Sequence, residues 1–452
     1  MTQTIHAKSA LLPTGWADSV LVEIDDGRIT TVQPGARLAG QTIDILLPAP
    51  CNLHSHAFQR AMAGLTERRG PGSDSFWTWR TLMYRFLDRL TPDDVLAIAA
   101  QVQVEMLEAG YGAVGEFHYL HHAPGGHAYD DLAQMSVAIA TAAGETGIGL
   151  THLPVLYMQG GSDGRDLNGG QLRFGNDLDQ FTRLLEGAQH GLADLPDAAL
   201  GIAPHSLRAV GVEALTTATT LLPGVPFHIH IAEQIAEVNE ILGTHGATPV
   251  KWLLEVMDVG REWCLIHATH MSPAETEGLA RSGAVAGLCP ITESNLGDGI
   301  FDGARFVEAG GRWGVGSDSN VRISLSEELR TLEYSQRLGE QQRCVLAPPD
   351  GSTGRALYNS ALDGGAQALG RASGVIAAGN WADLVALDGD ALALTGLKGD
   401  AILDAWIFAG DDTVVRDVWS AGRHMVRDGR HMHRQAIEDR YRSVMRSLAA
   451  EL

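Results

Sequence analysis

The sequence predicts an α/β protein: a (β/α)8 TIM barrel with a small β-sandwich domain built from both chain ends. Two observations predict this fold. Short β-prone segments alternate with longer helical patterns between residues 48 and 375, and both ends of the chain consist of short strands separated by turns. We expect residues 1–47 to form the N-terminal part of the sandwich and residues 48–375 the barrel. Residues 376–452 would then supply the C-terminal part of the sandwich and a terminal helix.

The chain ends carry the turn signals of paired strands. The segment "SVLVEIDDGRITTVQPG" alternates in polarity and contains Asp26 followed by Gly27, which predicts a hairpin. Near the other end, "GNWADLVALDGD" and "TVVRDVWSAGRHMVRDGRHM" are similar short β runs broken by glycine and aspartate. The likeness of the two ends indicates one small β-domain that flanks a central block.

The central block contains eight β-prone segments, which suit the eight strands of a barrel. In chain order they are "DILLPAPCNLHSH", "YGAVGEFHY", "GIGLTHLPVLY", "ALGIAPHSLRA", "PFHIHIAE", "WCLIHATH", "GAVAGLCP" and "GRWGVGSDS". Helical patterns separate most of them. In "TPDDVLAIAAQVQVEMLEAG", Thr91 is the expected N-cap, Pro92 suits the first turn and Gly110 ends the helix. A doubly wound sheet would share this rhythm.

The strand ends favour the barrel over the doubly wound sheet. Almost every β-prone segment ends in a polar or ionisable residue, and barrel active sites are assembled at the carboxyl ends of the strands. These residues are His54 and His56, His118 and Tyr119, Tyr157, His205, His230 and Glu233, His267 and His270, and Asp318.

Charge restricts the expected partners. The chain has 452 residues, 45% of them apolar, and a formal net charge of −22. Such an acidic surface repels nucleic acid and anionic lipid, so neither nucleic acid nor a membrane is an expected partner. It also repels an anionic substrate, unless arginines inside the pocket reverse the local field.

The cysteines and the N-terminus point to the cytoplasm. The four cysteines, Cys51, Cys264, Cys289 and Cys344, are scattered and form no CxxC motif, which predicts reduced thiols. The first residues, "MTQTIHAKSALLPTGWADS", lack the pattern of a secretory signal, and no apolar stretch is long enough to span a membrane.

Two histidine pairs suggest a metal site. His54 and His56 are two residues apart on a strand, so both can face one point, and neutral imidazole is a ligand for Zn²⁺ or Fe²⁺. A pair of hydrogen-bonded histidines is the plainer alternative. In "PFHIHIAEQ", one histidine could be a third ligand, and His228 is the expected bystander because it lies lower in the strand than His230.

Three further strand ends carry ionisable groups. Glu233 would lie at the rim, where a carboxylate can exchange protons with a substrate, although a helix-start carboxylate would look the same. Asp318 follows an apolar strand, and a metal ion would compensate its burial, although it could instead cap the next helix. His267 is preferred to His270 because it lies closer to the end of its strand.

Lysine placement limits the number of metal ions. The only lysines are Lys8, Lys251 and Lys398, and none ends a β-prone segment. A bridging carbamylated lysine therefore has no candidate. One metal ion with three histidines and one aspartate is the consistent count, although a second ion held by carboxylates alone stays open.

The motifs "HSH", "HIHIAE", "HATH" and "GSDS", in this order, resemble the amidohydrolase superfamily. The longer segments "NLHSHAFQRAMAGL", "DSFWTWRTLMYRF", "EFHYLHH" and "HSLRAV" are similar to the branch that deiminates N-formimino-L-glutamate. The resemblance implies one divalent metal ion, usually zinc with iron(II) as the alternative, on His54, His56, His230 and Asp318. It implies proton handling by Glu233, His267 and Asp318, and substrate binding by Gln59, Arg80, Tyr119, His205 and Arg208. Asn320 departs from the pattern, in which histidine is expected.

The resemblance also implies the reaction. The enzyme would hydrolyse N-formimino-L-glutamate, a dicarboxylate, to N-formyl-L-glutamate and ammonia in histidine degradation, and would be a homodimer. One alternative is a sister amidohydrolase that deaminates or dechlorinates a purine, pyrimidine or triazine. Another is an inert barrel that serves as a binding protein.

Overall fold

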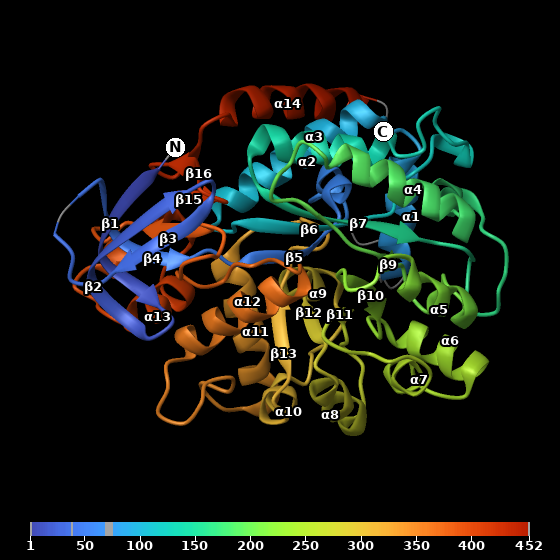
Figure 1. Ribbon diagram of the computed structural model, residues 1–452. Helices are drawn as coiled ribbons and strands as arrows, with labels where there is room; N and C mark the ends of the chain where they lie inside the picture. Colours follow the sequence, from blue (N-terminus) through green and yellow to red (C-terminus); the bar gives the residue numbers. More distant parts are fainter. Residues whose placement is uncertain (1, 38, 68–75, 451–452) are drawn as a thin grey trace.

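The computed structural model describes residues 2–37, 39–67 and 76–450 (Figure 1). A β-sheet with its own helix lies on the left of Figure 1, and a larger α/β part lies on the right. The last helix, α14 (Arg434–Ala450), leaves the sheet and runs along the top of the α/β part.

Both chain ends contribute to one eight-stranded sheet, in the order β17-β16-β15-β14-β4-β1-β2-β3. Its strands are β1 (Gln3–Leu12), β2 (Gly15–Asp25), β3 (Arg28–Gln33), β4 (Gln41–Pro48), β14 (Leu384–Leu387), β15 (Val415–Ser420), β16 (Arg423–Arg427) and β17 (Arg430–His431). The predicted hairpin is confirmed: Asp26 and Gly27 connect β2 to β3 with φ angles of 46° and 75°. Both residues tolerate this left-handed conformation, which a two-residue hairpin turn requires.

The α/β part contains parallel strands in two sheets. One sheet holds β5 (Cys51–Ser55), β6 (Ala113–His118), β7 (Gly149–Leu156), β8 (Ala199–Leu200) and β9 (Ala203–Pro204). The other holds β10 (Phe227–Ile231), β11 (Trp263–His267), β12 (Val285–Leu288) and β13 (Arg312–Val315). Isolated parallel bridges link the two sheets, from Ser55 to Asp318 at one junction and from Ile202 to Phe227 at the other. The α/β class with parallel strands is confirmed.

Two of the predicted strands are each divided in two. The segment "DILLPAPCNLHSH" contains the end of β4, which belongs to the terminal sheet, and β5, because prolines at positions 48 and 50 separate them and cannot donate to a sheet ladder. The segment "ALGIAPHSLRA" contains only the two-residue strands β8 and β9.

Helices follow most of the parallel strands. They are α1 (Phe76–Leu87), α2 (Pro92–Glu108), α3 (Gln134–Thr146), α4 (Leu178–Gly191), α5 (Val212–Leu221), α6 (Ile235–His245), α7 (Pro249–Val256), α8 (Pro273–Ser282), α9 (Pro290–Leu296), α10 (Gly303–Glu308), α11 (Leu325–Glu340), α12 (Thr353–Ala368) and α13 (Ala401–Phe408). The predicted start of α2 is confirmed, since the Thr91 hydroxyl accepts from the backbone N–H of Asp94 and the Asp94 carboxylate accepts from that of Thr91. This reciprocal cap satisfies two amide groups of the first turn.

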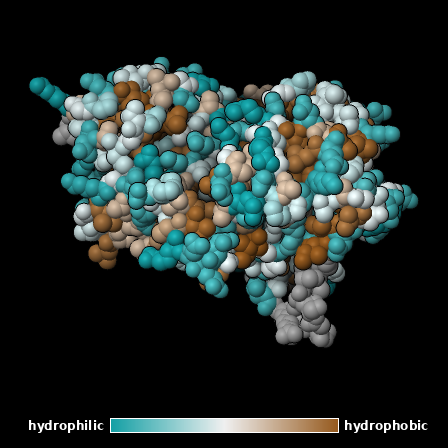
Figure 2. Space-filling view, turned by 90° about the horizontal axis from the view of Figure 1, so that it is seen from below, coloured by the Kyte–Doolittle hydropathy of each residue, from teal (hydrophilic) through white to brown (hydrophobic). Residues whose placement is uncertain are grey.

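The parallel strands are buried on both faces. Every residue of β5, β6, β7, β10, β11 and β12 is buried, as expected for parallel strands covered by helices. The outer surface mixes both kinds of residue, and Figure 2 shows hydrophobic residues in several separate patches among hydrophilic ones. No helix within the described ranges combines the length and the apolar character needed to cross a bilayer.

An ion network ties the terminal sheet to the α/β part. Arg371 donates from Nε to Asp383 at 2.6 Å and from Nη2 to Asp197 at 2.9 Å, and Arg423 of β16 donates to both oxygens of Asp197 at 2.8 Å. Burial alone would raise the pKa of Asp197, but Arg423 and Arg371 outweigh it and lower the pKa. The stabilisation from Asp197 is therefore present above about pH 4, the ordinary pKa of aspartate, and is lost as the pH falls below it.

Replacing Arg371 by Met should destabilise the protein strongly, because it removes one partner from a buried network. We expect the free energy of unfolding to fall by about 3–5 kcal/mol, measured by urea denaturation at neutral pH. The control is Arg416→Met, which removes an exposed ion pair with Asp428 and should cost less than about 1 kcal/mol. Equal, small losses in both variants would contradict a stabilising role for the network.

Candidate active site

A cavity opens at the carboxyl ends of the parallel strands. Of the eleven residues predicted for the site, ten line this cavity: His56, Gln59, Arg80, Tyr119, His205, Arg208, His230, Glu233, His267 and Asp318. The eleventh, His54, is fully buried and packs against His56 and His230. The structure thus brings all eleven predicted residues together.

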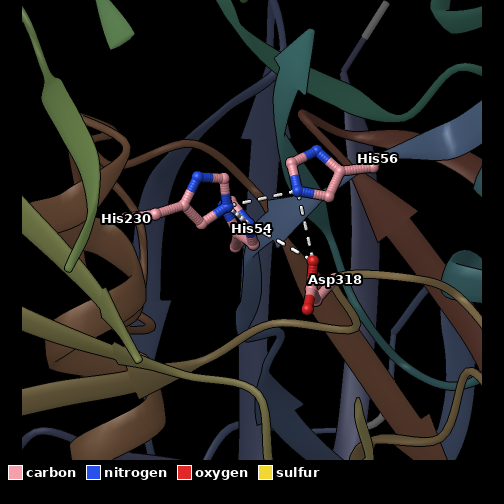
Figure 3. Close-up of side chains that lie close together, drawn as sticks. All are labelled: His54, His56, His230 and Asp318. Carbon is pink, nitrogen blue, oxygen red and sulfur yellow. Dashed lines mark hydrogen bonds and ion pairs between the residues drawn. The ribbon is translucent and has the colours of Figure 1, made fainter. Parts of the chain in front are cut away.

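Four of these side chains converge on one point (Figure 3). Nε2 of His230 lies 3.1 Å from Nε2 of His54 and 3.3 Å from Nε2 of His56. Oδ1 of Asp318 lies 3.5 Å from Nε2 of His54 and 3.2 Å from Nε2 of His56. His54 lies in β5 and His56 follows it directly, His230 lies in β10, and Asp318 follows β13, so the cluster gathers residues from both parallel sheets.

The orientation of the rings shows that the cluster fits a cation. His56 donates Nδ1–H to the carbonyl of Phe117 at 2.8 Å, and His230 donates Nδ1–H to the carbonyl of His205 at 3.1 Å. Burial lowers the pKa of His230 well below its ordinary value, so its ring is neutral and its Nε2 carries a lone pair. Lone pairs that face each other at this distance repel unless a cation lies between them. Imidazole nitrogens and one carboxylate are ligands that Zn²⁺ accepts.

The junction between β5 and β13 places Asp318 in the cluster. The backbone N–H of Asp318 donates to the carbonyl of His54, and the N–H of His56 donates to the carbonyl of Asp318, both at 2.9 Å. Asn320, which departs from the family pattern, donates from Nδ2 to Ser55 Oγ at 3.2 Å and to the carbonyl of Asp318 at 3.1 Å. Asn320 therefore stabilises the turn that presents Asp318.

Glu233 and His267 form a second pair beside the cluster. Nε2 of His267 lies 3.9 Å from Oε1 of Glu233 and 3.9 Å from Oδ2 of Asp318, while Nδ1 lies 3.2 Å from Oε1 of Glu293. Burial raises the pKa of Glu233 to about 7, against the opposing charge of His267. Burial alone would lower the pKa of His267, but Glu233, Glu293 and Asp318 outweigh it and raise the pKa to about 10. A bound divalent cation would lower both pKa values.

Basic and aromatic side chains also line the cavity. Arg80 of α1 donates from Nη2 to the hydroxyl of Tyr157 at 3.2 Å, and its guanidinium lies 5.2 Å from the centre of the Tyr84 ring. Arg208 is buried and lines the same cavity. Gln59 donates to the hydroxyl of Tyr119 at 2.6 Å. The cavity is therefore lined both by carboxylates and by two guanidinium groups.

Gln59 and His205 offer acceptors to a ligand in this cavity. Oε1 of Gln59 is buried and has no hydrogen-bond partner among the residues that the structure describes. Burial lowers the pKa of His205 well below its ordinary value, and the charge of Arg208 adds to that effect. The neutral His205 ring can accept as well as donate a hydrogen bond.

Sequence reasoning missed several residues of the cavity. Met83, Phe174, Leu296 and Ser319 line it, and Glu293 contacts His267 from α9. All five lie outside the strands, where no strand-end rule applies. One predicted strand-end histidine lies elsewhere, since His118 packs beside the His152 and His121 rings. His228, the expected bystander, donates Nε2–H to the carbonyl of Ala368 at 2.7 Å.

Similarity to known proteins agrees with this geometry. Residues 45–425 match the amidohydrolase family, and the chain belongs to that family. Within it, residues 2–41 match the N-terminal domain of formimidoylglutamate deiminase HutF. Over 434 residues the chain is 51% identical to the formimidoylglutamate deiminase of Pseudomonas aeruginosa, with 94% of this chain and 95% of that protein covered.

More distant relatives share the fold. The chain is 26% identical to a 5-methylthioadenosine/S-adenosylhomocysteine deaminase of Natronomonas pharaonis, over 83% of this chain and 81% of that protein. A crystal structure of an amidohydrolase from Brucella melitensis superposes with a TM-score of 0.96 at 48% identity, covering 99% and 100% of the two chains. An adenosine deaminase from Xanthomonas campestris, determined with bound zinc, superposes with a TM-score of 0.83 at 21% identity, over 99% and 98% of the two chains.

Metal content tests the cluster directly. We expect the purified protein to bind one divalent metal ion tightly per chain, and His230→Ala to lose it because one of four ligands is gone. Metal analysis after dialysis measures this. His228→Gln is the matched control, since His228 lies two residues away on the same strand and contacts only a backbone carbonyl. Full metal content in His230→Ala would show that the ion is bound elsewhere.

Proposed function

We propose that this chain hydrolyses N-formimino-L-glutamate to N-formyl-L-glutamate and ammonia, with one divalent metal ion as cofactor. The single observation that carries the proposal is a cavity lined both by residues of a candidate metal-binding cluster and by Arg80 and Arg208. The identity to the Pseudomonas aeruginosa deiminase supports the same substrate.

His54, His56, His230 and Asp318 would hold the metal ion, with zinc as the first choice and iron(II) as the alternative. A bound ion of this kind supplies Lewis acidity, which makes hydroxide available near neutral pH. His230, His56 and Asp318 line the cavity, so the ion would lie at its floor, within reach of a substrate.

Proton transfer falls to three carboxylate and imidazole groups. Asp318 and His267 would take the proton of the attacking water, since Oδ2 of Asp318 and Nε2 of His267 both face the cavity. Attack on the formimino carbon gives a tetrahedral centre that carries two nitrogens and one oxygen. Glu233 would deliver a proton to the terminal nitrogen, which then leaves as ammonia. Burial raises the pKa of Glu233 above its ordinary value, so this carboxyl group holds a proton closer to neutral pH than an exposed glutamate does.

The charges of the cavity match the polarity of this substrate. N-formimino-L-glutamate carries a cationic formiminium group and two carboxylates. The formiminium would lie near Glu233 and Asp318, and Arg80 and Arg208 would bind the carboxylates through their planar, bidentate donor groups. Gln59, Tyr119 and His205 line the same cavity and would hold the formimino and amide groups.

A heterocycle is the second candidate substrate. Tyr119, Tyr157 and Phe174 line the cavity and could stack on a ring, and the Natronomonas pharaonis relative is named as a deaminase of purine compounds. The two guanidinium groups favour the dicarboxylate, because a planar guanidinium matches a carboxylate, and a neutral ring offers none. An inert binding protein would not need the Glu233 and His267 pair beside an intact metal cluster.

The finer architecture belongs to the same proposal. We infer that the two parallel sheets form one eight-stranded barrel over residues 48–375, because bridges at Ser55–Asp318 and Ile202–Phe227 join their edges. Residues 1–47 and 376–452 would form the sandwich with the terminal helix, since their strands share a sheet. The cytoplasmic location and the homodimer stay predictions.

Ammonia release tests the proposed reaction. We expect the metal-loaded enzyme to release ammonia from N-formimino-L-glutamate, with a kcat/KM at least about a hundredfold above that for adenosine or an aminotriazine, because the neutral rings offer no carboxylate to Arg80 and Arg208. A coupled glutamate dehydrogenase assay measures ammonia. A preference for either heterocycle would establish the alternative.

Substitution of the arginines tests the dicarboxylate. Arg80→Met and Arg208→Met should each lower kcat/KM by about 2–4 kcal/mol in free-energy terms, mainly through a higher KM, because each removes the partner of a buried carboxylate. Arg183→Met, at an exposed position of α4, is the matched control. Unchanged kcat/KM in both cavity variants would remove the basis for a dicarboxylate substrate.

Substitution of Glu233 tests the proton transfer. Glu233→Gln should lower kcat by about a hundredfold to ten thousandfold, because the amide keeps the shape of the side chain but cannot deliver a proton. Metal content should not change, since Glu233 is not one of the four clustered ligands. Glu213→Gln, exposed on α5, is the control. A nearly wild-type rate would assign the proton delivery to another group.

A further inference from the structure

Asp318 faces two groups of donors at once. Its Oδ1 atom lies against the imidazoles of His54 and His56, while its Oδ2 atom lies 3.9 Å from Nε2 of His267. A carboxylate that offers one oxygen to each of two donor groups has the geometry that bridges two neighbouring cations in two-metal sites.

Cys289 completes the second group. Its sulfur, a ring nitrogen of His267 and a carboxylate oxygen of Asp318 lie within 4.8 Å of one another, and all three residues are buried. Cys289 follows directly after β12, between the strands that carry the other two residues. The proposed deimination gives this thiol no role.

Glu293 holds the second group in place. Oε1 of Glu293 accepts the backbone N–H of Cys289 at 2.9 Å and lies 3.2 Å from Nδ1 of His267. One carboxylate oxygen therefore fixes the thiol residue and the imidazole relative to each other. Because Nδ1 faces Glu293, the Nε2 atom of His267 is the nitrogen turned toward Asp318 and the cavity.

The surrounding charge favours a cation here. Oε1 of Glu233 lies 3.9 Å from Nε2 of His267, so the carboxylates of Glu233, Glu293 and Asp318 all surround this ring. A thiolate and an imidazole select thiophilic ions over Mg²⁺ or Ca²⁺. The cavity gives such an ion a path from solvent, because His267 and Asp318 both line it.

We propose that His267, Cys289 and Asp318 form a second cation site, which takes a thiophilic divalent ion such as Cd²⁺ or excess Zn²⁺ and inhibits the enzyme when filled. Binding releases the thiol proton of Cys289 to solvent and forms the metal–sulfur bond. It also engages His267 and Asp318, the two groups that would take the proton of the attacking water. The inhibition rests on the proposed function, whereas the binding does not.

Cadmium titration tests the site in enzyme that already contains one zinc ion per chain. The total metal should rise toward two ions per chain with zinc retained, and the ultraviolet charge-transfer band of a cadmium thiolate should appear. Deiminase activity should fall in step with that band. In Cys289→Ser and Cys289→Ala, we expect the charge-transfer band to vanish. Half-inhibition should require at least about tenfold more cadmium, because loss of a residue that only supports a metal ligand already lowers metal affinity about tenfold or more, and Cys289 is a direct ligand.

Two further cysteines serve as controls. Cys344 is exposed and could bind cadmium by itself, so all measurements use a Cys344→Ser background. Cys264→Ser is the matched variant, because Cys264 is equally buried in the same apolar cluster but belongs to no group of ligand side chains among the described residues. It should behave like its parent.

Three results would overturn the site: a band that survives loss of Cys289, inhibition that is unchanged in both Cys289 variants, or cadmium that replaces zinc without raising the total metal. An enzyme that binds the second ion through Cys289 but releases no ammonia from N-formimino-L-glutamate would instead leave the site standing and refute the proposed function.

Discussion

The meeting of three imidazoles and one carboxylate at a single point is the constraint on which the rest of the active site depends. Nε2 atoms of His54, His56 and His230 face one another at hydrogen-bond distance, and the backbone carbonyls of Phe117 and His205 fix two of those rings with Nδ1–H outward. Such an arrangement of lone pairs is unfavourable without positive charge between them. The fold therefore holds these lone pairs together at an electrostatic cost, which a bound divalent cation offsets. The positions of the proposed catalytic groups beside the cluster depend on the same arrangement.

Backbone pairing between β5 and the residues after β13 brings the ligands of the cluster together. The two backbone hydrogen bonds between Asp318 and the histidines at the end of β5 bring a carboxylate from the last parallel strand against ligands from the first. About 260 residues separate these partners, so the cluster forms only when the parallel strands have assembled around it. Asn320 then stabilises the turn with its side-chain amide, which explains how the chain accommodates asparagine where the family pattern has histidine.

A protein with a negative net charge needs positively charged side chains inside its cavity to bind a dicarboxylate. The formal net charge is −22, and further carboxylates crowd the end of the cavity around His267. Arg80 and Arg208 line the same cavity, and Arg80 donates to the hydroxyl of Tyr157. Guanidinium groups in the cavity supply the positive charge that a dicarboxylate needs. The same negative charge around His267 explains why this end also attracts a second cation.

The sequence predicted the histidines at the strand ends, but it did not predict every residue that lines the cavity or contacts those histidines. Period-two spacing lets His54 and His56 face one point, and position at strand ends puts His230 and His267 at the same edge of the parallel strands. Their proposed roles came from the resemblance to the amidohydrolase superfamily. No local pattern identifies Phe174 or Glu293, which reach the site from a loop and a short helix whose positions depend on tertiary packing. The prediction that "DILLPAPCNLHSH" forms one strand was wrong, because Pro48 and Pro50 divide the segment between two sheets.

Left-handed backbone conformations at or after the ends of two of the strands direct His267 and Asp318 toward the cavity. His267 and Asp318 have φ angles of 71° and 45°, in the left-handed region that costs non-glycine residues of order 1–3 kcal/mol. The turn after β11 is held by Ala268, whose N–H donates to the carbonyl of Ile231 at 3.0 Å, and the turn at Asp318 by its bonds to β5. Regular extended backbone would turn successive side chains to opposite faces. The left-handed residues break that alternation, so His267 and Asp318 can both face the cavity at the cost of strain that the neighbouring strands offset.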